Sequence, residues 1–458
     1  MKVVEQKLFM SEKRIGIDMK KVVILGGGLS GISTAYFLQN QDWVDSITIL
    51  EKEPTTGGLC RTIEKNGYLY DIGPHILFSK DKEMLNLMLS VLKEKNSLKR
   101  SNQILYKGKY VQYPFENDLS KLPEEDLDYC IKAFNNNPYE NYEASNMIQF
   151  FLKTFGEGIT NTYLRPYNEK IWKYDPAFMN TSMVDRIPKP TQEEIRRSAA
   201  GETVDGYVHQ LYFSYPTNGG IESVVNGFKD QLNKKCKIYT DTEAIKVRKD
   251  NSKYFINCAN GKEYISDMII STIPIHEFSK AYANSTQKIK NCVNELRYNS
   301  IAIAFVKTKK DLCGDNYAFM IPDKNVIFHR ISKMDFLGES YHHSTDEATY
   351  MIEVTYRKND HIDTMSDVKL LSKIKEGLIT IKFAEKLDDI EIIDLTKYQY
   401  AYVIYDLNHA ENMNKIREFY NNEGIILNGR FGNFEYWNMD RILRESFELA
   451  KNLNKTIN

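Results

Sequence analysis

The stretch KKVVILGGGLSGISTAYFLQN, residues 20–40, followed by SITILEKE, residues 46–53, decides the fold. It starts with a short apolar run, passes through a glycine-rich turn into an amphipathic segment, and reaches a second apolar run that closes on Glu51. Short apolar runs on either side of a segment with helical periodicity indicate strand, helix and strand. The sequence therefore predicts a βαβ unit and, with it, a parallel sheet.

Three glycines, Gly26, Gly28 and Gly31, stand in the turn of this unit with the spacing GxGxxG. Glycines at these positions permit a tight turn and a close backbone approach, and the helix that follows points its N-terminus at a pyrophosphate. Glu51, at the end of the second strand, is placed to bind ribose hydroxyls. A lone GxGxxG can be a fortuitous turn, but strand, helix and terminal acid in register predict a dinucleotide site.

The rest of the chain predicts an α/β fold whose nucleotide-binding core is discontinuous. Three helical segments, EMLNLMLSVL, LPEEDLDYCIKAF and NMIQFFLKTF, separated by turn residues, are predicted between about residues 85 and 155, and short strands follow between 237 and 274. The alternating segments SIAIAFVKT and TYMIEVTYR predict a second, antiparallel sheet. The end of the chain reads as strand, loop and helix. The expected parts are an extension at 1–18, a Rossmann-like domain at 19–80, 215–275 and 420–458, a mainly helical substrate domain at 81–214, and a sheet-containing substrate domain at 276–419.

Composition narrows the classes of function. The 61 basic and 62 acidic residues nearly cancel, so no global field favours nucleic acid or an anionic membrane. The chain lacks an apolar run of about 18 or more residues and its first 18 residues lack the apolar core of a signal peptide, which predicts a cytoplasmic protein without stable membrane insertion. Six cysteines without a CxxC pattern favour reduced thiols over a disulfide frame or a metal site. Balanced charge is compatible with a homodimer.

A second glycine turn indicates which dinucleotide is bound. EKEPTTGGLCRT, residues 51–62, places Gly57, Gly58 and Arg61 just beyond the acid. It resembles the GGxxRT element of the large FAD-binding family that contains amine oxidases, protoporphyrinogen oxidase, phytoene desaturases and UDP-galactopyranose mutase. EAIKV followed by MIISTIP, and NGRFGNFEYWNMD near the end, agree with it. The resemblance implies FAD, with the last loop and helix N-terminus approaching the flavin and its ribityl chain.

A narrower resemblance, to UDP-galactopyranose mutase, extends over nearly the whole chain from about residue 20. Four motifs carry it in the family's order: DIGPHILFS, YVQYPFENDLSKLP, LRPYNEKIW and GRFGNFEYWNMD. The resemblance implies that the first places His75 beside the flavin with Phe78 nearby, and that the second receives a uridine. It gives the following residues as substrate or cofactor contacts: Tyr113, Phe115, Asn168, Trp172, Gly429, Arg430, Tyr436 and Asp440.

Two further arginines follow from spacing within that resemblance. Arg186 in MVDRIP and Arg330 in IPDKNVIFHRIS stand where the mutases hold a diphosphate, and charge-assisted forks suit that group. The resemblance implies that both, with His75, take part in catalysis. Each of these residues also has a structural alternative. Either arginine can form an ordinary surface salt bridge, and His75 can be a structural histidine. LRPYNEKIW can be the end of a helix in which Trp172 belongs to the core.

The chain also departs from the mutase pattern. Met320 and Leu337 fall near positions that hold tyrosines there, Gln210 replaces an asparagine, and Glu116 replaces the glutamine of YPFQ. Tyr405 is a tentative match to a further sugar-site tyrosine. The diphosphate grip is therefore expected to be kept while the sugar pocket differs, and the sugar need not be galactose.

The resemblance implies a mechanism without net oxidation. Reduced flavin attacks the anomeric carbon, UDP leaves and returns, and the sugar ring recloses on another hydroxyl, so pyranose and furanose forms interconvert. The mechanism requires that the flavin be reduced beforehand, and NAD(P)H is a candidate reductant. The resemblance also implies a role in cell-surface polysaccharide biosynthesis. The alternatives are a flavin oxidoreductase of the amine oxidase or protoporphyrinogen oxidase type, and a flavin-retaining scaffold without turnover.

Overall fold

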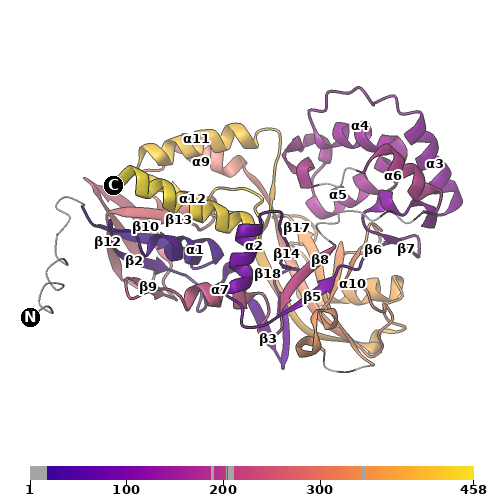
Figure 1. The fold of residues 1–458 in the computed structure, drawn as a ribbon, viewed down its shortest axis with the longest axis horizontal. Coiled ribbons are helices and arrows are strands. Elements are labelled where there is room, and N and C mark those ends of the chain that lie inside the picture. Colours follow the sequence, from indigo (N-terminus) through magenta and orange to yellow (C-terminus); the bar gives the residue numbers. More distant parts are fainter. Residues whose placement is uncertain are drawn as a thin grey trace, which may run out of the picture.

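A computed structural model describes residues 18–186, 190–202, 204, 211–342, 344 and 346–457 of the 458-residue chain. The βαβ unit is confirmed: β1 (Lys20–Leu25) leads through the glycine turn into α1 (Leu29–Leu38), and β2 (Val44–Leu50) pairs with β1 in parallel. Together with β9 (Cys236–Tyr239), β13 (Met268–Ser271) and β19 (Ile425–Leu427) they form a parallel sheet of order β19-β13-β1-β2-β9. The sheet thus unites three distant parts of the chain (Figure 1).

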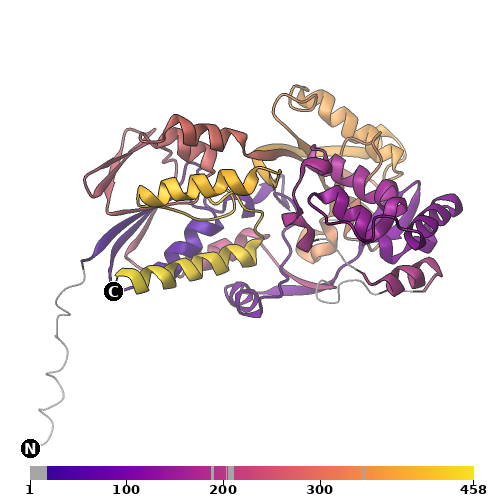
Figure 2. The ribbon, with the colours of Figure 1, turned by 90° about the horizontal axis from the view of Figure 1, so that it is seen from above.

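Helices cover this sheet because its strands are apolar throughout. Val22 to Leu25 are all buried, as expected for a strand covered on both faces. On one side, α1 packs against α7 (Glu222–Lys229) and the C-terminal α12 (Met439–Ile457), whose Phe447 ring lies 5.4 Å from that of Phe37 (Figure 2). A small antiparallel sheet accompanies it, formed by β10 (Ala244–Asp250), β11 (Lys253–Cys258) and β12 (Glu263–Ser266). Nearby lie α8 (Ile275–Ala281), α9 (Gln287–Glu295) and α11 (His409–Asn422).

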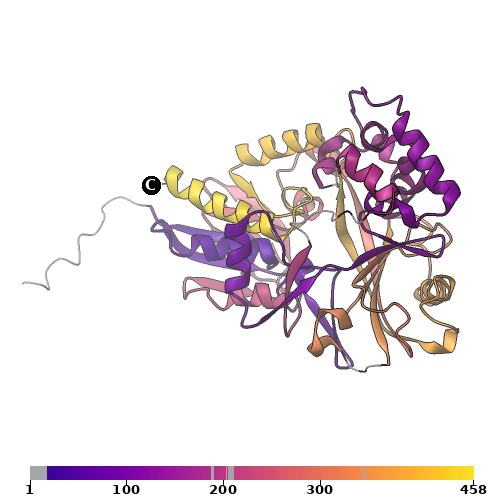
Figure 3. The same cartoon turned by 45° about the vertical axis from the view of Figure 1, so that its right-hand side comes forward.

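The expected second sheet is present and has seven strands in the order β18-β14-β17-β16-β15-β6-β7. Along β14, Ile301, Ile303 and Phe305 belong to the core shared with the parallel sheet, whereas Ala302 and Ala304 belong to a core covered by α10 (Asp367–Thr380) (Figure 3). This alternation follows from the two-residue period of a strand. The strands are β14 (Arg297–Thr308), β15 (Ala318–Met320), β16 (Arg330–Lys333), β17 (Ala348–Tyr356) and β18 (Ile390–Ile404), with β6 (Asn102–Tyr106) and β7 (Lys109–Gln112).

A group of helices stands beside this sheet at the upper right of Figure 1. It contains α3 (Glu124–Asn135), α4 (Met147–Ile159), α5 (Arg165–Trp172) and α6 (Gln192–Ala199). A π-helical turn, Thr160–Leu164, joins α4 to α5. Pro166 lies in the first turn of α5, directly after this π-helical turn, and because it has no N–H it cannot donate to a carbonyl of the preceding turn.

The three helical segments expected between about residues 85 and 155 are confirmed, but the strands between the first two were not predicted. Helix α2 (Lys82–Ser90) begins where Asp81 accepts a hydrogen bond from the Met84 N–H, but β5 (Lys95–Lys99), β6 and β7 follow it. β5 pairs with the distant β8 (Tyr212–Pro216), and β6 and β7 extend the seven-stranded sheet. These strands are stabilised by pairing with segments that are distant in sequence, and such pairing leaves no local periodicity from which a strand can be predicted. A hairpin of β3 (Thr62–Lys65) and β4 (Tyr68–Asp71) leads into the candidate site.

Within the described residues, every helix is too short or too polar to cross a bilayer. The six cysteines are free.

Candidate functional site

Two glycine turns lie against each other at the C-terminal edge of the parallel sheet. The Gly57 N–H donates to the Gly27 carbonyl at 2.9 Å. A Cβ on Gly28 would stand 3.6 Å from the Cα of Gly58, and a Cβ on Gly31 would lie 1.9 Å from the Gly26 carbonyl oxygen. The sequence GxGxxG is thus required by close backbone approach at this point.

The predicted acid and cation hold these turns in place. Glu51 is buried, and its two carboxylate oxygens accept the N–H groups of Gly27, at 2.7 Å, and Glu53, at 2.9 Å. The Nε of Arg61 donates to the Gly58 carbonyl at 3.1 Å. Each Glu51 oxygen keeps a second lone pair for another donor such as a ribose hydroxyl.

The first turn of α1 is suited to an anionic group. Gly28 caps the helix without a side chain, so no side-chain oxygen satisfies the N–H groups of that turn. Gly429 follows β19 and approaches from the other side: a Cβ there would lie 2.4 Å from the Ser30 hydroxyl. Glycine backbone on both sides of an open helix N-terminus fits the pyrophosphate of FAD.

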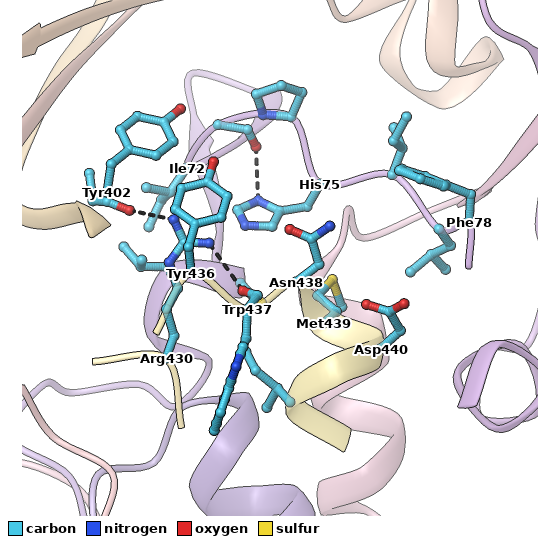
Figure 4. A pocket seen from close by; sticks show the side chains of 18 of the residues that line it. Ile72, His75, Phe78, Tyr402, Arg430, Tyr436, Trp437, Asn438, Met439 and Asp440 are labelled. Carbon is cyan, nitrogen blue, oxygen red and sulfur yellow. Dashed lines mark hydrogen bonds between the residues drawn. The ribbon is translucent and has the colours of Figure 1, made fainter. Parts of the chain in front are cut away.

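A cavity of about 250 Å³ lies beyond this turn, between the loop after β4 and the N-terminus of α12 (Figure 4). Six of the predicted site residues and fifteen others line it. They are Leu59, Cys60, Ile72, Gly73, Pro74, His75, Ile76, Leu77, Phe78, Met88, Ile301, Arg330, Ala401, Tyr402, Arg430, Tyr436, Trp437, Asn438, Met439, Asp440 and Ile442.

His75 is a neutral acceptor in this cavity. Its Nδ1 lies 2.9 Å from the Gly73 carbonyl, which can only accept, so Nδ1 carries the proton and Nε2 keeps its lone pair. Burial lowers the pKa of His75 to about 4, and Arg430 and Arg330 contribute to the lowering. At neutral pH the ring therefore accepts a hydrogen bond through Nε2.

Arg330 is held by a buried carboxylate. Its Nε and one terminal nitrogen form a fork to Glu353 at 2.5 and 2.6 Å, and Tyr402 hydrogen-bonds to both partners at 3.1 Å. Glu353 is fully buried, and Arg330 stands directly opposite it in the β16–β17 pairing. Burial by itself would lower the pKa of Arg330, but Glu353 holds it well above the usual value. An anion in the cavity would therefore share this cation with Glu353.

Arg430 differs because neutral groups hold it. Its terminal nitrogens donate to the carbonyls of Trp437, at 3.1 Å, and Ala401, at 2.8 Å, and its guanidinium lies 4.1 Å from the centre of the Tyr436 ring. Its Nε is buried and has no hydrogen-bond partner. A buried donor left unpaired costs about 1–3 kcal/mol, so this nitrogen indicates an acceptor supplied by a bound group.

Aromatic rings form the wall behind Arg330. Tyr402 and Tyr436 are stacked at 5.9 Å, and Trp172 meets both edge-on at 5.9 and 5.8 Å. The indole Nε1 donates to Asn168 at 2.8 Å, one helical turn earlier, and Asn168 donates to the Leu164 carbonyl. Asn168 thus fixes the orientation of Trp172, which packs behind the two tyrosines that line the cavity.

Other predicted contacts lie away from the cavity lining. Phe115 is fully buried and stacks on Tyr163 at 4.6 Å, and Tyr113 is half-buried. The Tyr405 hydroxyl donates to Glu435 at 2.6 Å and accepts the Tyr436 N–H at 2.8 Å, which fixes the loop before α12.

Two residues considered for the substrate site, Arg186 and Gln210, fall where the structure does not describe their side chains. Arg186 ends the short η6 (Thr181–Arg186), and its side chain lies outside the described part of the structure. Gln210 also lies outside the described residues. Met320 and Leu337, the two departures from tyrosine, are buried.

Sequence reasoning missed Glu353 and Tyr402, and it assigned no individual contact to Trp437, Asn438 and Met439 within the motif GRFGNFEYWNMD. Glu353 did leave a signal, because a single acid stands within the apolar run YMIEVTY, and a buried charge needs a partner. Tyr402 is one of several tyrosines in β18, and nothing in its local sequence distinguishes it from the others.

Comparisons with known proteins agree with this fold. Coproporphyrinogen III oxidase of Bacillus subtilis is 20% identical over 87% of this chain and 90% of its own length. UDP-galactopyranose mutase of Mycoplasma genitalium is 24% identical over 65% of this chain and 69% of its own. The structure of reduced UDP-galactopyranose mutase superposes with a TM-score of 0.85 at 22% identity, covering 96% of this chain and 97% of that one. Residues 29–410 match the family model of the flavin containing amine oxidoreductases, and the chain therefore belongs to this family.

Proposed function

We propose that this flavoenzyme is an FAD-dependent mutase that interconverts the pyranose and furanose forms of a UDP-sugar, either UDP-galactose or a related sugar. One observation carries the proposal. His75 and Tyr436, from two of the motifs, and Arg330, assigned by spacing, line one cavity, and Trp172 from a third motif packs against its wall. Two guanidinium groups with tyrosine hydroxyls nearby suit a diphosphate and sugar hydroxyls.

The chain's own residues have separable roles in this proposal. Bound in its reduced form, FAD supplies the nucleophile for the anomeric carbon. The glycine turns and the first turn of α1 hold its pyrophosphate, and the free Nε of Arg430 donates to an acceptor edge of the cofactor. Arg330 holds the substrate diphosphate, oriented by Glu353.

His75 and the aromatic wall complete the site. The Nε2 of His75 accepts a hydrogen bond from a hydroxyl of the substrate or cofactor without itself becoming charged, since its pKa is lowered to about 4. Trp172, Tyr402 and Tyr436 exclude water from the reacting groups.

A flavin-dependent oxidase of the porphyrinogen type is the second candidate. The coproporphyrinogen III oxidase relative covers more of this chain than the mutase relative does, 87% against 65%. The carboxylates of a porphyrinogen would suit the same two arginines. A cationic amine would not, because Arg330 and Arg430 both face the cavity.

The experiment is turnover by purified, FAD-loaded protein, with and without dithionite reduction. UDP-galactose and a panel of UDP- and dTDP-sugars are separated by chromatography after incubation, and coproporphyrinogen III is offered to the oxidised protein. An isomeric sugar formed only after reduction supports the mutase and identifies the sugar. Oxidation of coproporphyrinogen without any sugar isomer would reject it. Bleaching of the flavin by NADH or NADPH tests the predicted reductant.

A variant pair tests the role of Arg330. Arg330→Ala should raise the KM for the nucleotide sugar by about 10- to 100-fold, because it removes charge-assisted hydrogen bonds worth about 1.5–3 kcal/mol. The bound FAD, measured by absorbance, should be unchanged. Arg165→Ala is the matched control, since Arg165 forms a surface ion pair with Glu169 at 2.8 Å and is 45% exposed. An unchanged KM in Arg330→Ala would contradict the assignment.

A further inference from the structure

A second cavity, of about 580 Å³, lies between α5 and α10. It shares no lining residue with the flavin cavity. It is lined by Pro166, Glu169, Lys170, Lys173, Lys324, Asn325, Val326, Ile327, His361, Ile362, Met365, Lys369 and Lys373. Five of these thirteen side chains are lysines and only one is an acid, in a protein whose total charge is close to zero.

The lysines are not all neutralised by neighbouring acids. Lys324 pairs with Glu169 at 3.3 Å and Lys373 with Glu376 at 2.6 Å. Lys173 and Lys369 take part in none of the ion pairs formed by described residues, although Asp360 acts on Lys173 from a greater distance. Burial partly removes the ammonium of Lys173 from water and lowers its pKa. Two ammonium groups therefore remain for an anion.

The cavity also has an apolar floor. Val326 and Ile362 are each only 1% exposed, and Ile327, Met365 and Pro166 lie beside them. Inorganic anions gain nothing from such a surface, whereas a molecule that joins an anion to a flat or apolar group does. Lysine is a point-charge binder of phosphate that needs no fixed fork geometry.

We propose that this cavity binds a phosphorylated small molecule, with its phosphates on Lys173 and Lys369 and its apolar part on the floor around Val326 and Ile362. The site does not depend on the mutase chemistry. The elements that line it continue to the flavin site: α5 ends at Trp172, which packs against the tyrosines of that site, and the loop after β15 leads to Arg330. Lys170 links α5 to the loop after β15, because its Nζ donates to the carbonyls of Ile321 and Asp323 at 2.7 Å each.

The test is calorimetric titration of the FAD-loaded protein with ADP, with inorganic tripolyphosphate and with adenosine, at constant ionic strength. The principal variant is Lys173→Asn with Lys369→Ala. Asparagine is chosen because Lys173 has a left-handed backbone, with φ of 48°, which asparagine tolerates. The matched control is Lys234→Ala with Lys288→Ala, which removes the same charge from two exposed positions outside the cavity.

We expect ADP to bind more tightly than tripolyphosphate or adenosine, and the principal variant to weaken ADP binding at least about tenfold. The control should stay within twofold. Lys369→Ala alone, at an exposed position where substitution changes stability little, should also weaken binding measurably. Equal affinities in the two double variants, no binding of either phosphate to the wild type, or binding abolished by Arg330→Ala instead, would overturn the proposal.

Discussion

Replacing Glu116 by glutamine should stabilise the protein in a pH-dependent manner. Glu116 lies in the 3₁₀ turn Phe115–Asn117, is only 1% exposed, and has one carboxylate oxygen without a hydrogen-bond partner. Burial raises the pKa of Glu116 from 4.5 to about 7. The folded protein therefore binds a proton at Glu116 more readily than the unfolded chain does.

The sign and the size follow from that shift. The favourable contribution of protonated Glu116 is complete below pH 4.5 and is lost as the pH rises through 7. A shift of about 2.5 units corresponds to about 3 kcal/mol at pH 8.5. Glutamine does not titrate, so Glu116→Gln should change the free energy of unfolding little at pH 5 and raise it by up to about 3 kcal/mol at pH 8.5.

The assay is denaturant unfolding of FAD-loaded wild type and variant at pH 5 and pH 8.5, followed by flavin fluorescence and circular dichroism. Glu140→Gln makes the same charge change at an exposed position and serves as control. A gain of equal size at both pH values would show that the effect is not electrostatic. A loss of stability at pH 8.5 would refute the reasoning, because it would mean that the ionised carboxylate is favourably placed.

Two further predictions concern the glycine turns and the Arg330 fork. Gly28→Ala should leave the thermal unfolding of the apoprotein nearly unchanged, because its Cβ meets only ordinary contacts from 3.6 Å, yet weaken FAD binding at least about tenfold, since the methyl narrows the gap where the pyrophosphate is expected. Fluorescence titration of the apoprotein measures this, and unaltered FAD affinity would contradict it. Glu353→Leu should destabilise the protein by about 3–5 kcal/mol because it leaves Arg330 unpaired, and adding Arg330→Met should restore most of the loss. Additive losses in the denaturation cycle would show that the pair is not coupled.

The sequence predicted the parts of the fold that local pattern encodes. The βαβ unit, the paired glycine turns and the strands β14 and β17 carry their own periodicity and turn residues. Strands β5 to β7 were missed because their partners are distant or lie at a sheet edge, and KNSLK, the sequence of β5, lacks an apolar run.

The site was predictable to a similar extent. Motif residues such as His75 and Arg430 line the cavity, but the pairing of Arg330 with Glu353 depends on the register of β16 and β17, which no single segment specifies. The lysine-lined cavity depends on the meeting of α5 with α10, some two hundred residues later in the chain. Such contacts are properties of the assembled fold.

The order of strands in the parallel sheet also bears on synthesis of the chain. Strand β1 leaves the ribosome first and pairs with β13, which in turn pairs with β19. This side of the sheet is therefore complete only when residues 425–427 have been made. Helix α12 then packs on α1, with a hydrogen bond between Ser33 and Ser446. A nascent or truncated chain that stops before β19 lacks Gly429, Arg430 and the N-terminus of α12. If these groups hold the flavin as proposed, yellow colour in a purified preparation would report that translation and folding had reached the last helix.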